Sequence, residues 1–171
     1  MHERSLFDVG RETDLSSCVR QSVRMGETAL TLRQADEGTI GYVERVLARN
    51  GLPERDVRSK PDCFYVASAG DRRVGIGGLE LHGPAGLLRS VVVEEPHRGA
   101  GLGTALCAAL EARASAEGVE TLYLLTTSAT EFFDDRGYVA VDRCDAPDAI
   151  RGTTEFEALC PTTATCLRKS L

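Results

Sequence analysis

A glycine-rich turn after a run of valines is the part of this sequence best suited to bind a ligand. The segment supplies three valines, an arginine, three glycines and a threonine: Val91, Val92, Val93, Arg98, Gly99, Gly101, Gly103 and Thr104. Glycines let a backbone approach an anion closely, and free N–H groups at a helix start carry partial positive charge. An arginine side chain can add a charge-assisted contact. Such a turn can hold a phosphate group.

Three kinds of phosphate site use such a turn, and their spacing distinguishes them. A P-loop requires a lysine after its last glycine, and none follows here. A dinucleotide fingerprint requires glycine or alanine in its sixth position, where either register places Thr104 or Leu106. The CoA pyrophosphate site of acyltransferases has the pattern Arg/Gln-x-x-Gly-x-Gly/Ala, and Arg98-x-x-Gly101-x-Gly103 fits it. An exposed turn without a ligand is the alternative to the CoA site.

Alternating and helical apolar patterns predict the elements around this turn. Strands are expected over 28–33, 64–69, 74–81, 87–93, 122–125, 138–141 and 164–168. Helices are expected from an N-cap at Asp36 to residue 50, over 102–118, and over 130–136. This order predicts an α+β (mixed α/β) fold around one central sheet.

Length and charge limit the classes of protein. The 171 residues fit one domain, and the net charge of −6 argues against nucleic-acid binding and against a basic membrane-surface protein. No apolar run approaches the roughly 18 residues that span a bilayer, and no secretory signal is visible, so a cytoplasmic location is expected. We expect residues 1–25 to be a poorly ordered extension, with Met25 a candidate natural start, and residues 26–171 to form the domain.

Residues 28–168 resemble the GCN5-related N-acetyltransferase (GNAT) superfamily. The element order agrees, the segment 91–104 resembles its cofactor motif, and the segment 129–138 resembles its second signature. The C-terminal region resembles a narrower group, the small acetyltransferases associated with arsenic-resistance operons. That likeness depends on Ile150, Thr154, Glu155, Phe156, Leu159, Cys160 and Pro161.

The resemblance implies a central, mostly antiparallel sheet of six to seven strands that splays after the fourth strand and is flanked by helices. It implies acetyl-CoA as co-substrate. No metal is expected, because the sequence contains no C-x₂-C or clustered Cys/His spacing. Main-chain groups of Val91 and Val93 would pair with the pantetheine arm, and an N–H of Val92 or Val93 would face the thioester carbonyl. The glycines and Thr104 would hold the pyrophosphate.

Proton transfer is less well defined by the sequence. The acceptor amine must lose a proton before attack, and Glu80, Glu155 or an ordered water chain are the candidate bases, with surface carboxylates as the alternative for each glutamate. Many members of the superfamily use a tyrosine to protonate the departing thiolate, and Phe133 holds its usual position here. A thiolate with a pKa near 8.5 can leave without full protonation, so this change does not abolish activity.

Arg89 interrupts the apolar run 87–93, and a period of two places it on the face of Val91 and Val93. A charge in a buried strand is costly unless it is paired. Because the resemblance places this part of the strand beside the acceptor site, Arg89 is a candidate for binding an anionic group of the acceptor, such as a carboxylate. An internal salt bridge, for example with Glu80, is the alternative.

The resulting expectation is an N-acetyltransferase that moves an acetyl group from acetyl-CoA to a primary amine of a small molecule. An amino acid or an amino-acid-like toxic compound is a candidate acceptor, with a link to arsenic resistance. The resemblance also allows a homodimer. The alternative is a non-catalytic module that senses acyl-CoA.

Overall fold

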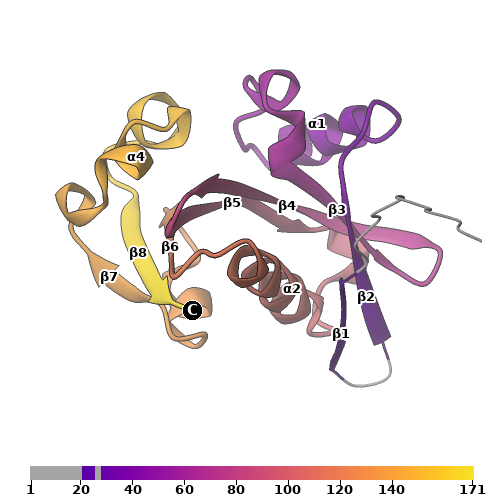
Figure 1. The fold of residues 1–171 in the computed structure, drawn as a ribbon. Coiled ribbons are helices and arrows are strands. Elements are labelled where there is room, and N and C mark those ends of the chain that lie inside the picture. Colours follow the sequence, from indigo (N-terminus) through magenta and orange to yellow (C-terminus); the bar gives the residue numbers. More distant parts are fainter. Residues whose placement is uncertain (1–20, 26–27) are drawn as a thin grey trace, which may run out of the picture.

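The computed structural model describes residues 21–25 and 28–171. Eight strands form a single sheet in the order β1-β2-β3-β4-β5-β6-β8-β7 (Figure 1). Their bounds are Gln21–Met25 (β1), Thr28–Gln34 (β2), Phe64–Ala69 (β3), Arg72–His82 (β4), Ala85–Val93 (β5), Thr121–Thr126 (β6), Val139–Val141 (β7) and Thr165–Ser170 (β8). All neighbouring strands are antiparallel except β5 and β6. The predicted mixed α+β class is confirmed.

Strands β2 to β8 are the seven strands that the sequence predicts. β1 was not predicted, because residues 21–25 lie in the segment expected to be a poorly ordered extension. It pairs antiparallel with β2, from Gln21 opposite Leu32 to Met25 opposite Thr28. The rest of that expected extension, residues 1–20, lies outside the described residues.

The sheet opens at its centre. β5 and β6 pair over only three positions, from Ala85 opposite Thr121 to Leu87 opposite Tyr123. β5 continues to Val93, so the edge of residues 88–93 that faces β6 has no strand partner among the described residues. This is the splay that the resemblance implies after the fourth of the seven predicted strands.

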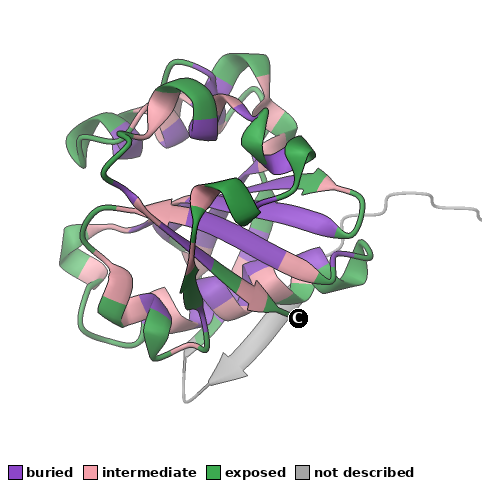
Figure 2. Ribbon diagram, turned by 90° about the vertical axis from the view of Figure 1, so that its left-hand side faces the viewer, coloured by how far each residue is buried: buried purple, intermediate pink, exposed green. Residues whose placement is uncertain are grey.

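Helices cover both faces of the sheet (Figure 1). α2 (Leu102–Ala116) packs on one face, and α1 (Ile40–Arg49) and the short α4 (Asp148–Arg151) lie on the other. Fully buried leucines and valines fill both interfaces, and the central strands are buried along much of their length (Figure 2). Apolar burial of this kind is the main stabilising contribution to a domain of this size.

The helices differ from the prediction in two respects. α1 begins after Thr39 rather than after the predicted N-cap Asp36, because Asp36 starts a preceding turn in which Thr39 Oγ1 donates to its carboxylate. The region 143–159 was predicted without helices. It contains a 3₁₀ turn, α4 and a π-helical turn, Glu155–Leu159. α3 (Thr130–Asp134) lies within the predicted helix 130–136.

Two glycines of β4 allow close packing around β5. A Cβ atom on Gly77 would lie 2.5 Å from Cδ1 of Leu110 in α2. A Cβ atom on Gly78 would lie 2.8 Å from Cγ of Arg89. These glycines therefore make room for α2 on one face of the sheet and for the Arg89 side chain on the other.

Candidate active site

A β-bulge in β5 shapes the site. Ile76 is opposite Val92 and Gly78 is opposite Arg89, so two residues of β5 face one residue of β4. Ser90 in this bulge has a φ of 57°, a left-handed conformation that few residues other than glycine adopt. Such strained backbone concentrates at functional sites.

The bulge corrects the predicted orientation of Arg89. Val91 and Val93 pack with the α2 side of the core, whereas Val92 packs with the α1 side. The Arg89 guanidinium lies 5.4 Å from the ring centre of Phe64, a member of the α1 side. Arg89 therefore shares a face with Val92, not with Val91 and Val93, because the extra residue shifts the alternation by one.

A cavity of about 350 Å³ lies beside the glycine-rich turn. It is lined by Val91, Val93, Arg98, Gly99, Gly101, Leu102, Gly103, Thr104, Ala129, Phe132 and Phe133. The structure thus brings together every predicted cofactor residue except Val92, which lines the neighbouring cavity instead. The walls of the 350 Å³ cavity are the bulged half of β5, the start of α2, and α3.

The residues of this cavity fit a phosphate-bearing ligand. The first turn of α2 has neither a capping side chain nor an acidic residue, so its free N–H groups face no competing acceptor there. Gly99 and Gly101 have φ values of 84° and 76°, which a residue with a Cβ atom rarely adopts. A Cβ atom on Gly103 would touch the Phe132 ring at 3.4 Å. Arg98 at the mouth donates to the carbonyl oxygen of Val93 at 2.8 Å.

A second, larger cavity of about 690 Å³ adjoins the first and shares five lining residues with it, Val91, Val93, Arg98, Ala129 and Phe133. Four separate segments form most of its walls, and Arg98 and Phe133 complete them. The segments are the loop 50–53, β5 over residues 88–93, the end of β6 with residues 124–129, and the C-terminal turn 155–161. Hydroxyl groups line part of it, from Ser90, Thr126, Thr127 and Ser128. The shared residues join the two cavities at the splay between β5 and β6.

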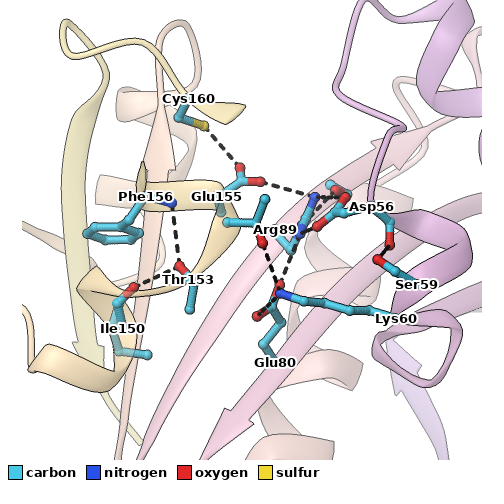
Figure 3. A network of polar contacts seen from close by, with 12 residues as sticks. Asp56, Ser59, Lys60, Glu80, Arg89, Ile150, Thr153, Glu155, Phe156 and Cys160 are labelled. Atoms are coloured by element: carbon cyan, nitrogen blue, oxygen red, sulfur yellow. Dashed lines mark hydrogen bonds and ion pairs between the residues drawn. The ribbon is translucent and has the colours of Figure 1, made fainter. Parts of the chain in front are cut away.

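A buried ion cluster forms one side of the second cavity (Figure 3). Arg89, with 1% of its side chain exposed, lies at its centre. Its Nη1 is 2.5 Å from Asp56 Oδ2 and 2.9 Å from Glu80 Oε1, and its Nη2 is 3.0 Å from Asp56 Oδ1 and 3.1 Å from Glu155 Oε2. Nε donates to Ser90 Oγ at 3.3 Å. Each nitrogen of the Arg89 guanidinium thus donates at least one hydrogen bond, and Nη2 also forms an ion pair with Glu155 Oε2, an atom without a hydrogen-bond partner among the described residues.

The internal salt-bridge alternative for Arg89 is therefore the arrangement that the structure contains. Glu80 is a partner, as suggested, and Asp56 and Glu155 are further partners that the sequence did not indicate. An anionic group of an acceptor would have to displace one of these carboxylates. Binding of such a group by Arg89 stays a prediction that this geometry does not favour.

The charges of the cluster do not balance. Lys60 Nζ lies 3.2 Å from Glu80 Oε2, and His82 Nε2 lies 3.6 Å from the same oxygen. Among the described residues, three carboxylates therefore face two permanent cations, Arg89 and Lys60, which leaves one excess negative charge while His82 is neutral. A buried excess charge favours the approach of a cation.

The structure distinguishes the two candidate bases by position. Glu155 lines the second cavity, and Glu80 is not among its lining residues. Glu155 is 6% exposed, and its Oε1 accepts a hydrogen bond from the Cys160 thiol at 3.0 Å. Burial, followed by the hydrogen bond to Glu155, raises the pKa of Cys160 to about 12. The thiol therefore stays protonated and serves as a donor near neutral pH.

Phe133 lies where the two cavities meet, with 7% of its surface exposed. Its ring packs edge-on against Phe132 and Tyr138, at centroid distances of 5.1 and 5.3 Å. Tyr138 is buried, and its hydroxyl donates to Glu111 at 3.0 Å. Within the described part of the chain, no tyrosine lines either cavity.

Two negative findings concern the described residues alone. They contain no group of three or more His, Cys, Asp or Glu side chains arranged to hold a metal ion. None of their helices is both long enough and apolar enough to span a membrane.

A strand splayed from its neighbour beside a glycine-rich helix start is the arrangement that the resemblance to the GNAT superfamily implies. The chain belongs to the acetyltransferase (GNAT) family, whose model matches residues 30–138. No curated protein matches the chain.

Solved structures share the fold at low sequence identity. N-acetylglutamate synthase from Neisseria gonorrhoeae, complexed with coenzyme A and L-arginine, is 20% identical with a TM-score of 0.72, and the match covers 83% of this chain and 33% of that protein. Rv2747 from Mycobacterium tuberculosis, in complex with CoA and NLQ, is 20% identical with a TM-score of 0.69, over 82% of this chain and 98% of that one. Naa50 from Arabidopsis thaliana, in complex with the bisubstrate analogue CoA-Ac-MVNAL, is 14% identical with a TM-score of 0.64, and the match covers 83% of this chain and 99% of that one. The chain thus spans about a third of the synthase.

Proposed function

We propose that this protein acetylates a primary amine of a small molecule, with acetyl-CoA in the smaller cavity and the acceptor in the larger one. The observation that carries the proposal is that the two cavities meet at Val91, Val93 and Phe133. A thioester that enters from the glycine-rich turn would reach the acceptor at this junction. The hydroxyl-lined second cavity, about 690 Å³ in volume, suits a compact polar acceptor.

Residues of the first cavity would bind the co-substrate. The backbone N–H groups of Gly101, Gly103 and Thr104 would hold the pyrophosphate at the start of α2. The unpaired edge of β5 would hydrogen-bond to the pantetheine arm in the manner of an added strand. The co-substrate supplies an activated acetyl group, and the amine nitrogen replaces the sulfur on its carbonyl carbon.

Glu155 is the carboxylate that we assign to the acceptor amine. Its position on the second cavity and the excess negative charge of the cluster favour an ammonium group there. Amines bind as cations near neutral pH and must lose one proton before attack. Glu155 would orient the ammonium group and receive that proton directly or through water.

An acetyl-transfer assay with a matched acceptor panel tests this function. The panel pairs each amino acid with its amide and its decarboxylated amine, and adds polyamines, aminoglycosides, and amino-acid-like arsenicals and phosphinates. Acceptor-dependent release of free thiol, with an acetylated product in the mass spectrum, is expected. Glu155→Gln should raise the acceptor KM or lower kcat without changing the Kd for CoA.

The same panel tests the acceptor class and the alternative function. Because every guanidinium nitrogen of Arg89 already donates a hydrogen bond and three carboxylates pair with its charge, amides and amines are expected to react at least as well as the parent amino acids. A strong preference for the free carboxylate would restore Arg89 as an acceptor-binding residue. Tight acetyl-CoA binding without thiol release on the whole panel would support the acyl-CoA-sensing module.

A further inference from the structure

The cofactor cavity has little positive charge for the ligand assigned to it. CoA carries a pyrophosphate and a 3′-phosphate, and the whole chain has a net charge of −6. Among the described residues that line the cavity, Arg98 is the only lysine or arginine. Its guanidinium already donates to Val93 O and to Asn50 Oδ1, each at 2.8 Å. A further cation near this cavity would therefore matter for affinity.

Arg136 supplies a positive charge beside the first turn of α2. It follows α3, and its guanidinium donates to the side-chain oxygen of Thr104 and to the carbonyl oxygen of Phe132. The guanidinium carbon lies 3.5 Å from the centre of the Phe132 ring, in a stacked contact. Both Thr104 and Phe132 line the cofactor cavity. These contacts fix Arg136 at the edge of the phosphate-binding turn.

The charge of Arg136 is not neutralised by the described part of the protein. No carboxylate among the described residues forms a salt bridge with it, in contrast to Arg89, which has three. Its Nε is buried and has no hydrogen-bond partner among them. An arginine held in this way is pre-organised for an anion, because the stacking and the Thr104 contact already restrict its side chain.

We propose that Arg136 is a second phosphate-binding residue of the CoA site, acting beside the backbone N–H groups of α2. The inference rests on the proposed function, since it takes the ligand of this cavity to be CoA. Arg98 and Arg136 would then contact the phosphate-bearing half of CoA from two different segments. Thr104 would have two tasks, binding a phosphate through its N–H and positioning Arg136 through its hydroxyl.

Calorimetric titration with CoA tests the assignment. The variants are Arg136→Gln, Arg136→Lys and, as a matched control, Arg73→Gln, whose arginine stacks on Tyr42 and lines neither cavity. Arg136→Gln should weaken CoA binding about tenfold, an effect that grows at low salt. Arg136→Lys should restore part of the affinity, and Arg73→Gln should leave it unchanged. Thermal melts of each variant check that the fold is intact.

Truncated ligands distinguish the phosphates. If Arg136→Gln weakens the binding of CoA but not that of dephospho-CoA, Arg136 binds the 3′-phosphate. If it weakens the binding of both ligands equally, Arg136 binds the pyrophosphate. S-acetylpantetheine has no phosphate. If Arg136→Gln weakens its binding as much as that of CoA, the proposal is overturned and Arg136 serves the packing of Phe132. Unchanged binding of CoA by Arg136→Gln would overturn it as well. Failure of the unmodified protein to bind CoA would instead contradict the proposed function.

Discussion

The thiol of Cys160 donates a hydrogen bond to Oε1 of Glu155 across 3.0 Å, while Arg89 approaches the other oxygen of the same carboxylate at 3.1 Å. The two contacts reach the carboxylate from different sides and restrict its orientation (Figure 3). Glu155 and Cys160 both line the larger cavity. Glu155 is therefore oriented by neighbours that lie 66 residues before it and five residues after it.

Replacement of Cys160 by alanine should loosen this carboxylate. A hydrogen bond to a charged group contributes about 1.5–3 kcal/mol when fully buried, and the partial exposure of Cys160 reduces this to about 1 kcal/mol. We expect the acceptor KM to rise about fivefold in steady-state assays, with CoA affinity unchanged. Cys144→Ala, which removes an exposed thiol, is the control. Equal acceptor KM values for the two variants would contradict the positioning role.

Alkylation should report the protonation state of Cys160. Burial and the Glu155 carboxylate raise the pKa of Cys160 to about 12, so its thiolate is scarce at pH 8.5 and becomes more abundant as the pH rises toward 12. Iodoacetamide should therefore modify exposed Cys144 well before Cys160, as read by peptide mass spectrometry. Glu155→Gln removes the negative charge and should accelerate the modification of Cys160. A rate that does not respond to Glu155→Gln would show that burial alone protects the thiol.

Substitutions of different members of the ion cluster should lower the free energy of unfolding by different amounts. Arg89→Met leaves three carboxylates facing Lys60 alone, and loss of one partner of a buried pair typically costs about 3–5 kcal/mol. Asp56→Asn should cost less, because it removes a negative charge from a cluster with one in excess. Urea unfolding of both variants gives the free energies to compare. An equal or larger loss for Asp56→Asn would indicate that hydrogen-bond geometry, not charge balance, dominates.

Phe133→Tyr should show how much a phenol contributes at this position. Phe133 lines both cavities, so an added hydroxyl would lie near the thioester sulfur of a bound co-substrate. The departing thiolate has a pKa near 8.5 and needs little protonation, so we expect kcat to rise less than tenfold, mostly below pH 8. Phe132→Tyr, on the neighbouring ring, is the control. A lower kcat with unchanged binding would mean that the apolar junction itself is required.

The grouping of the predicted cofactor-binding residues around one cavity could be anticipated from the sequence, because most of these residues are contiguous. The strand, the arginine, the glycines and the helix start all lie within residues 91–104, and local rules for turns and helix ends apply to them directly. Arg136 was missed because it reaches this region from another segment. No local pattern indicates that its partner is Thr104, 32 positions earlier.

The acceptor half could be predicted only in part, because its contacts join distant segments. Glu80 and Glu155 were singled out, but Asp56 was not, since nothing in the sequence links it to a residue 33 positions away. The face of Arg89 was predicted wrongly because strict alternation cannot include a bulge, and Ser90 gives little warning of a positive φ. β1 was missed because residues 1–25 mix charged residues, serine and glycine without a clear apolar periodicity, and three of its own five residues are polar.

The larger cavity, which we assign to the acceptor, is formed mainly by four separate segments, so its shape can be changed one segment at a time. Insertions or substitutions in the loop 50–53 or the turn 155–161 would reshape the acceptor cavity, while every residue that lines the smaller cavity lies within 91–104 or 129–133. Acceptor range could therefore be engineered by changes in the loop 50–53 and at Leu159 and Pro161, without altering the residues that line the smaller cavity. Libraries at these positions, with Glu155 and Cys160 kept, are the economical way to seek new acceptors.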